Sequence, residues 1–326
     1  MNFIDLFCGI GGFHYALQKH NLSCVFSADS NHHACEVYQK NYNISCFCDL
    51  TKITNESILD IPNFDILCAG FPCQAFSIAG KQKGFDDARG TLFFEICRFI
   101  SIKKPKVIIL ENVKNLLYHN NGQTFITIKN ILENFNYFFS YQVLNANNFG
   151  LPQNRERIIV IASLTKKFDF NSLPLSQEKP KLDDILEKNI IHNYLNSSEY
   201  TLISNPQQQK NSGLIFYGYL NKKTRTNGVK DNTLHLSRTH RQTNRIYSHL
   251  GTHPTISSQE TSGRYFIFDG IGVRKLTLLE CFRLMGFPDS FIKTGPKTSL
   301  YERIGNSVCP PMIYHLFHLI NQQNIL

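Results

Sequence analysis

The stretch FIDLFCGIGGFHYALQ, residues 3–18, contains an apolar strand, a glycine-rich turn and the start of a helix. Gly9, Gly11 and Gly12 lie directly after the run FIDLF. Glycines at such a junction let backbone N–H groups approach a ligand at the helix N-terminus. The stretch therefore predicts the first strand and helix of an α/β fold with a ligand at the turn. The alternative is a tight turn that binds nothing.

Apolar strand-like runs alternate with helix-length amphipathic runs through the first half of the chain. The runs SCVFSAD (23–29), FDILCAG (64–70) and KVIILENV (106–113) are apolar on both faces. This pattern predicts a parallel sheet covered by helices, which binds ligands at the carboxyl ends of its strands. After about Ser163 the pattern weakens into polar residues, which indicates a smaller, loop-rich domain.

Acidic residues end the next strands. Asp29 follows the glycine turn by about twenty positions, where a carboxylate accepts both hydroxyls of a ribose. Asp49, in CFCDL (46–50), is placed to accept the amine of an adenine, although alone it is typical of a helix cap. His14 replaces the third small residue of the dinucleotide fingerprint, so we expect an adenosine cofactor without phosphates.

Cys73 follows the strand FDILCAG within AGFPCQAFSIAGKQKGFDD, residues 69–87. Pro72 fixes the backbone before it and presents the thiol at the same sheet edge as the glycine turn. The loop behind it is basic and rich in glycine, with Lys81, Lys83, Arg89, Gly80, Gly84 and Gly90. A thiol beside positive charge suits a nucleophile that acts on a polyanion. The alternative is a buried structural thiol.

Three further polar residues lie near the ends of predicted strands. Glu111 ends KVIILENV, where a carboxylate with a raised pKa can bond a heteroaromatic ring nitrogen; the alternative is a helix cap. Arg155 and Arg157 alternate in QNRERIIVIA (153–162), so we expect both on one face as a clamp for a phosphate or carbonyl. A solvated strand edge is the alternative.

The formal net charge of +9 is concentrated in one segment. Residues 205–264 contain nine Lys or Arg and two acidic residues, a net charge of +7. Such a concentration indicates a polyanionic partner, and a solvated basic face is the alternative.

Cysteine spacing and hydropathy suggest a soluble, intracellular protein. The ten cysteines include no repeated CxxC pair, which favours reduced thiols, and the spacing around His32, His33 and Cys35 does not fit a four-ligand zinc site. We therefore expect no metal. No apolar run is long enough to cross a bilayer, and MNFIDLFCGI has no leader pattern.

Six blocks in fixed order resemble the C5-cytosine DNA methyltransferases, above all the small bacterial restriction-modification members. The blocks are FIDLFCGIGGF, GFPCQAFSIAGKQKGFDDARGTLFFEICR, ENV, QNRERIIVIA, RKLTLLECFRLMGFPD and YERIGNSV. They fall in roughly the first 165 and last 55 residues, and six ordered blocks are far more specific than one motif. The loop GKQKGFDDARGTLFF and the run RIYS look most like the corresponding stretches of the enzymes that modify GCGC.

The resemblance implies a Rossmann-like methyltransferase sheet with helices on both faces, plus a smaller target-recognition domain. It implies S-adenosylmethionine as methyl donor, S-adenosylhomocysteine as product, no metal, and a cytosine rotated out of duplex DNA. Cys73 would attack C6 of the base, Glu111 would engage N3 and the 4-amino group, and Arg157 and Arg155 would hold the base and the loop.

The family's cofactor positions carry over to Phe7, Gly9, Gly11, Gly12, Asp29, Asp49, Pro72 and Leu92, with Asn306 and Ser307 closing the site. Ser30 departs from the pattern, since many members have an apolar or aromatic residue there. Either Ser30 weakens the affinity for the cofactor, or Phe7 and Leu50 supply the stacking against adenine instead.

The basic segment falls where the family has its target-recognition domain. We expect a catalytic domain at 1–183, a recognition domain at 184–275, a hinge at 276–300 and a returning segment at 301–326. Gln242 and Arg245 match side chains that fill the vacated space or read guanine edges, and Lys81, Lys83, Arg89 and Arg241 would also contact DNA. The expected protein is a bacterial cytoplasmic, nucleoid-associated monomer, independent of membranes, with a separately acting restriction endonuclease.

Three other functions compete with this hypothesis. A transfer-RNA cytosine methyltransferase would share the chemistry, but the basic segment favours duplex DNA. A non-catalytic DNA-binding relative would lack the nucleophile or the acid, and this chain has Cys73 and Glu111. A nicotinamide dehydrogenase would leave Cys73 and the basic segment without a role.

Overall fold

The structure, a computed structural model, describes residues 1–72, 92–176, 178–188, 190–222, 232–257 and 265–326. Its contacts divide the chain into two units. Unit 1 comprises Met1–Leu144, Glu156–Pro174 and Ser307–Leu326, and unit 2 comprises Asn145–Arg155 and Leu175–Asn306. None of the helices in these described ranges is both long and apolar enough to cross a membrane.

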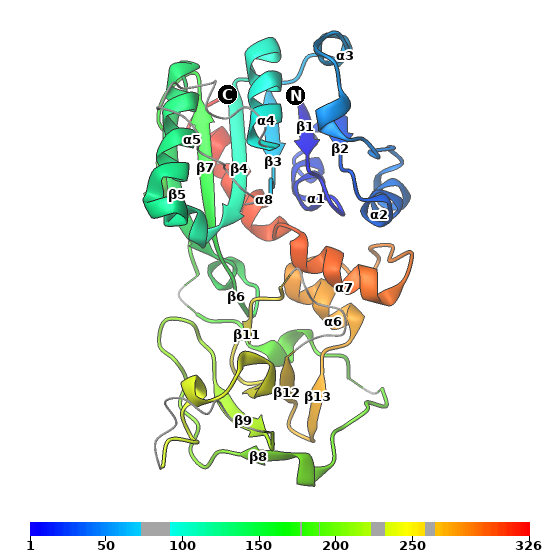
Figure 1. Cartoon of the computed structure of the whole chain (residues 1–326), viewed down its shortest axis with the longest axis vertical. Helices are drawn as coiled ribbons and strands as arrows, with labels where there is room; N and C mark the ends of the chain where they lie inside the picture. Colours follow the sequence, from blue (N-terminus) through cyan, green and yellow to red (C-terminus); the bar gives the residue numbers. More distant parts are fainter. Residues whose placement is uncertain (73–91, 177, 189, 223–231, 258–264) are drawn as a thin grey trace. The chain divides into compact units, whose positions relative to one another are not determined.

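Unit 1 contains a six-stranded sheet in the order β2-β1-β3-β4-β7-β5 (Figure 1). Its strands are β1 (Asn2–Leu6), β2 (Ser23–Ala28), β3 (Ile66–Ala69), β4 (Val107–Val113), β5 (Phe138–Asn145) and β7 (Glu156–Ser163). β1 pairs in parallel with β2 and β3, and β3 pairs in parallel with β4. β7 is antiparallel to β4, which the alternating pattern did not predict.

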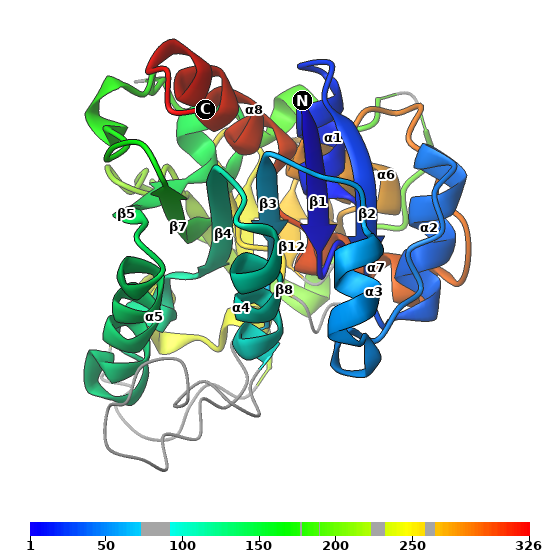
Figure 2. The ribbon, with the colours of Figure 1, turned by 90° about the horizontal axis from the view of Figure 1, so that it is seen from above.

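Helices cover both faces of this sheet (Figure 2). α1 (Gly12–Gln18) and α8 (Pro310–Gln322) lie on one face, and α3 (Asn55–Asp60), α4 (Leu92–Lys103) and α5 (Gln123–Asn134) lie on the other. α2 (His32–Tyr42) lies beyond β2. Strands that are apolar on both faces need this double cover. The predicted α/β class with helices on both faces is confirmed.

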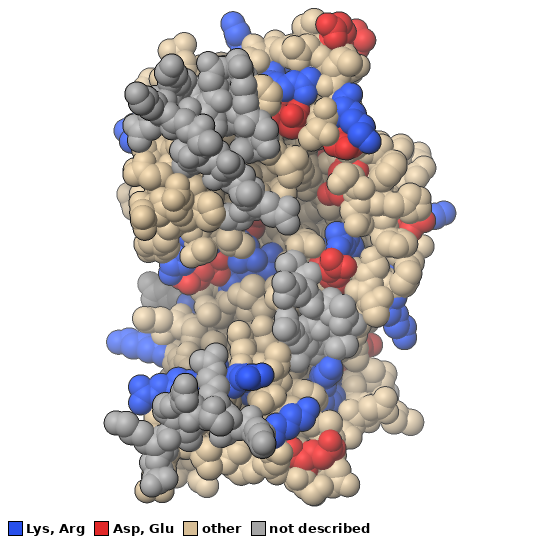
Figure 3. Space-filling model, viewed as in Figure 1, with Lys and Arg blue, Asp and Glu red and all other residues tan. Residues whose placement is uncertain are grey.

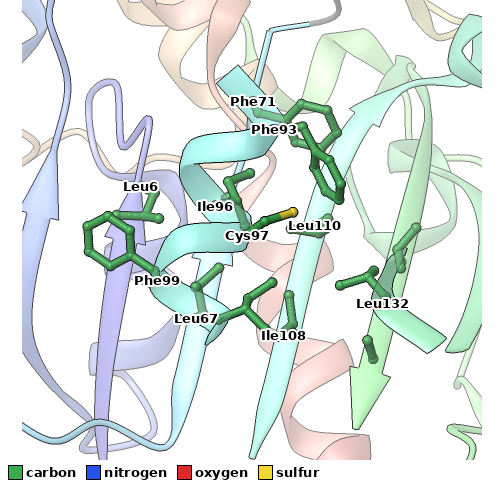
Figure 4. Close-up of a cluster of buried hydrophobic side chains, with 14 of the residues drawn as sticks. Leu6, Leu67, Phe71, Phe93, Ile96, Cys97, Phe99, Ile108, Leu110 and Leu132 are labelled. Atoms are coloured by element: carbon green, nitrogen blue, oxygen red, sulfur yellow. The ribbon is translucent and has the colours of Figure 1, made fainter. Parts of the chain in front are cut away.

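The core beside α4 fixes the strands whose ends carry the polar motifs. Phe93, Ile96 and Phe99 recur at helical spacing and are fully buried against strand residues such as Leu67 and Ile108 (Figure 4). Burying each such side chain stabilises the fold by roughly 1.5–3 kcal/mol. The strand ends are therefore held by a rigid, close-packed layer.

Unit 2 contains a five-stranded sheet in the order β13-β12-β10-β9-β8. The strands are β8 (Tyr200–Leu202), β9 (Phe216–Leu220), β10 (Arg245–Ser248), β12 (Phe266–Phe268) and β13 (Val273–Lys275). β10 is parallel to β12 and antiparallel to β9. The unit also contains the pair β6 (Gln153–Asn154) and β11 (His253–Pro254), with helices α6 (Leu278–Met285) and α7 (Lys297–Asn306).

Candidate active site

The turn between β1 and α1 uses left-handed backbone at three described positions. Phe7 has φ 56°, Gly9 φ 55° and Gly11 φ 87°. A Cβ atom at Gly11 would lie 2.2 Å from the ring of Tyr42, whose hydroxyl donates to the Gly11 carbonyl at 2.7 Å. A Cβ atom at Gly9 would meet no heavy atom within 4 Å. The turn thus requires glycine at Gly11 for packing and leaves open space beside Gly9.

Asp29 connects the end of β2 to this turn. One carboxylate oxygen accepts from the Gly9 N–H at 2.9 Å, and the other accepts from the Asn31 N–H at 2.8 Å. A carboxylate offers about four lone-pair positions, so it retains acceptor capacity for the hydroxyls of a ligand. The spacing in the sequence predicted that Asp29 ends the strand. No sequence pattern predicted that its carboxylate accepts a hydrogen bond from the Gly9 N–H.

Asp49 directly follows a segment that is hydrogen bonded to the backbone of Asp29. The Asp29 N–H donates to the Cys46 carbonyl, and the Cys48 N–H donates to the Asp29 carbonyl, both at 2.9 Å. Asp49 caps a short helix, and hydrogen bonds from the Thr51 side chain and backbone lower its pKa. Both the predicted cap role and an ionised carboxylate are therefore present. Leu50 is buried and Ser30 is exposed.

His14 lies beneath the turn as a packing residue. Its ring stacks on Tyr42 at a centroid distance of 4.0 Å, and its Nδ1 is 2.6 Å from the Tyr38 hydroxyl. Burial lowers the pKa of His14 to about 4 and raises the pKa of nearby Asp5 well above its usual value. The turn is thus packed against aromatic rings without charge. His14, the residue that departs from the dinucleotide fingerprint, is one of these rings.

The C-terminal block returns to the start of α1. A Cβ atom at Gly12 would lie 2.7 Å from the Ser307 hydroxyl oxygen and 2.6 Å from the Val308 side chain. The Ser307 hydroxyl donates to the Val308 carbonyl at 3.0 Å. The structure therefore brings Ser307 to the glycine turn. Asn306 is exposed and belongs to unit 2.

Glu111 and Arg157 form a nearly buried ion pair at the end of β4. Arg157 Nε lies 3.0 Å from Glu111 Oε1, with 13% and 10% of the two side chains exposed. Antiparallel pairing of β4 with β7 places Ile159 opposite Glu111 and Arg157 opposite Val113, which brings Arg157 to the strand end. The arginine neutralises a carboxylate that is held in a low-dielectric position.

The exit of β3 lies beside this ion pair. A Cβ atom at Gly70 would be 3.8 Å from Glu111 Oε2. The Asn112 side-chain amide donates to the Phe71 carbonyl at 2.8 Å and thereby fixes the backbone that leads through Pro72. Asn112 belongs to the motif ENV, in which a role was expected only for Glu111. Its position directly after Glu111 was the available signal.

Arg155 does not lie in the same strand as Arg157. It precedes β7, is 1% exposed, and donates to the carbonyls of Ile256 at 3.0 Å and Gly305 at 3.1 Å, all within unit 2. The two arginines were expected on one face because they alternate in sequence. β7 begins at Glu156, so the alternation does not apply across Arg155.

The remaining predicted residues divide between unit 2 and the part of the chain outside the described residues. Arg241 and Gln242 are exposed and Arg245 is half-buried. Lys and Arg side chains gather on the visible face of unit 2 (Figure 3). Leu92 begins α4. Cys73, Lys81, Lys83 and Arg89 lie outside the described residues, so their predicted roles stay predictions.

Comparisons with known proteins agree over nearly the whole chain. The sequence model of a family described as C-5 cytosine-specific DNA methylase matches residues 1–322. The chain is 36% identical over 339 residues to the type II methyltransferase M.HhaI of Haemophilus parahaemolyticus, covering 98% of this chain and 94% of that protein. It is 39% identical over 321 residues to the type II methyltransferase M.HpaII of Haemophilus parainfluenzae, covering 95% and 86%.

A solved structure shares the fold. The S. pombe Dnmt2 methyltransferase matches with a TM-score of 0.70 at 21% identity, covering 99% of both chains.

Proposed function

The chain belongs to the family of C-5 cytosine-specific DNA methylases, and from this premise we propose how its residues methylate C5 of a cytosine in duplex DNA. The predicted family, enzyme class and restriction-modification activity are confirmed. The transfer-RNA alternative is not supported, since the named relatives are type II methyltransferases. The dehydrogenase alternative, which leaves Cys73 and the basic segment without a role, is not supported by the family.

We propose that S-adenosylmethionine binds at the glycine turn. Open space beside Gly9 and the remaining lone pairs of Asp29 fit a ligand that carries ribose hydroxyls. Asp49, Leu50, Phe7 and Ser307 complete the site, with Gly11, Gly12, Pro72, Leu92 and Asn306 as further contacts; Ser30, being exposed, adds little stacking. When bound, the cofactor supplies an electrophilic methyl group.

The observation that carries the catalytic assignment is the Glu111–Arg157 pair beside the exit of β3. Cys73, the residue after Pro72 in the sequence, attacks C6 of the flipped cytosine in our proposal. Glu111 engages N3 and the 4-amino group, so that the ring accepts electrons, and Arg157 holds Glu111 and the base. Arg155 holds the Gly305 backbone, one residue before Asn306.

DNA recognition is assigned to the segment 184–275 within unit 2. Gln242 and Arg245 would contact base edges, Arg241 would contact a phosphate, and Lys81, Lys83 and Arg89 in the loop after Cys73 would contact further phosphates. We propose 1–183 and 301–326 as the catalytic segments, with 276–300 as a hinge between the recognition segment and the returning segment. We further propose a monomer in the bacterial cytoplasm, where the chromosome lies, with a separate cognate endonuclease.

Methyl transfer from labelled S-adenosylmethionine to duplex DNA tests this proposal, and bisulfite sequencing of the product locates the target. A duplex with 5-fluorocytosine at the target should form a stable covalent adduct, because fluorine cannot leave as a proton does. Cys73→Ser should form none, whereas Cys24→Ser, a half-buried thiol on β2, should form the adduct normally. An adduct with Cys73→Ser would overturn the assignment.

A further inference from the structure

An exposed arch in unit 2 links a buried histidine to β10. Arg241, Gln242 and Thr243 are exposed, and Gln242–Asn244 form one short 3-10 turn closed by the bond from the Asn244 N–H to the Arg241 carbonyl at 2.9 Å. His240 lies immediately before these residues and is 1% exposed. The arch is therefore anchored by a side chain that is itself removed from solvent.

The His240 side chain contacts β9 and the preceding segment. Its ring stacks on Tyr219 at a centroid distance of 4.1 Å and an interplanar angle of 16°. Its Nε2 lies 2.8 Å from the Leu234 carbonyl, so Nε2 carries the proton and donates. Burial lowers the pKa of this imidazole, and the neutral ring fits the stack.

Arg245 fastens the other end of the arch. Its Nε donates to the His240 carbonyl at 3.1 Å. Arg245 also lies opposite Tyr219 in the register of β9 and β10. Tyr219 therefore supports both ends, through its ring at His240 and through its backbone position at Arg245.

We infer that His240, stacked on Tyr219, is a positioning residue for specificity: it fixes the arch 241–244 so that Gln242 meets the DNA bases in one conformation. This inference rests on the proposed function of the arch in DNA recognition. A four-residue loop fixed at both ends loses little conformational entropy on binding, which strengthens binding to the correct site and sharpens discrimination. His240 itself touches neither DNA nor cofactor.

The test compares variants on the target duplex that bisulfite sequencing identifies. His240→Ala removes the stack and the bond to Leu234, so KM for DNA should rise about ten- to thirty-fold, and discrimination against duplexes with one changed base pair should fall. KM for S-adenosylmethionine and the single-turnover rate at saturating DNA should stay within about twofold of wild type. His240→Phe retains the stacked ring and should recover most of the loss.

His249→Ala is the matched control. His249 is half-buried in the same unit and bonds the Phe268 carbonyl at 3.0 Å, but it lies outside the arch. Equal increases in KM for DNA in His240→Ala and His249→Ala, or an equal rise in KM for S-adenosylmethionine, would show a loss of folding and overturn the inference.

Gln242→Ala separates this inference from the function on which it rests. If Gln242→Ala leaves DNA binding and discrimination unchanged, the arch does not read DNA and that part of the proposed function fails. If Gln242→Ala impairs both while His240→Ala impairs neither, the recognition assignment stands and the role of His240 is refuted.

Discussion

At the residue scale, the two arginines Arg155 and Arg157 have different binding partners, although only one residue separates them in the sequence. Arg157 pairs with Glu111 inside unit 1, whereas Arg155 binds the carbonyls of Ile256 and Gly305 inside unit 2. Arginine offers several donors in a rigid fork, so it suits a bond to one carboxylate and a bridge between two carbonyls equally well. The backbone position, and not the residue type, separates the two roles.

Replacing Glu111 by Gln should remove most of the activity. The amide cannot supply the negative charge opposite Arg157, nor exchange a proton with the base, so kcat should fall by about 10²- to 10⁴-fold. Single-turnover methylation with labelled cofactor measures this, and equilibrium binding of the cofactor should be unchanged.

Glu156→Gln provides the control for that change. Glu156 precedes Arg157 in β7 and pairs with Lys114 at 3.1 Å where both side chains are more than 40% exposed. Exposed pairs contribute roughly 0–1 kcal/mol, so activity and stability should remain near wild type. Wild-type kcat in Glu111→Gln would refute the proposed role of that carboxylate.

At the element scale, the junction of β1 and α1 is fixed by what packs on its glycines. Tyr42 of α2 fills the space at Gly11, and the side chains of Ser307 and Val308, together with the Val308 carbonyl, fill the space at Gly12. Elements 31 and almost 300 residues away along the chain therefore shape the turn that we propose as the cofactor site.

Gly12→Ala should destabilise the protein by about 1–2 kcal/mol. The added methyl would lie within 3 Å of three atoms, including the Val308 carbonyl, which cannot rotate away. The better helix propensity of Ala, about 1 kcal/mol, offsets only part of this overpacking. Urea unfolding of the full chain measures the change.

Gly70→Ala, at the end of β3, is the matched control for Gly12→Ala. Its Cβ would meet its nearest neighbours at 3.7 and 3.8 Å, which is ordinary van der Waals contact. We expect its free energy of unfolding to change by no more than about 0.5 kcal/mol. Equal stability of Gly12→Ala and wild type would contradict the packing described at the turn.

At the scale of the whole molecule, charge is distributed so that the net +9 resides largely in the segment 205–264. A protein that neutralises phosphates releases condensed counterions, and its DNA affinity then falls steeply as salt rises. The Kd for duplex DNA should therefore depend strongly on salt concentration, as titrations in a salt series will measure.

Arg241→Gln should reduce the slope of log Kd against log salt by about one, because one phosphate contact is lost. Lys129→Gln, an exposed lysine of α5 paired loosely with Glu133 at 3.9 Å, should leave the slope unchanged. A slope unaffected by Arg241→Gln, or reduced equally by both changes, would remove Arg241 from the DNA contact surface.

The sequence by itself determined the α/β class, the glycine turn, the acidic residues at the strand ends and the family. These follow from local patterns: apolar periodicity, glycine spacing and ordered motifs are visible within short windows. Asp29 and Glu111 could be predicted because each directly ends an apolar run.

Only the tertiary structure decided which groups meet. The antiparallel pairing of β7, the Tyr42 and Ser307 contacts at the glycines, the bond from Asn112 to the exit of β3 and the stack of His240 on Tyr219 all join distant segments. No local pattern encodes such contacts, because they depend on how whole elements pack and register. For the same reason, alternation in sequence could not separate Arg155 from Arg157.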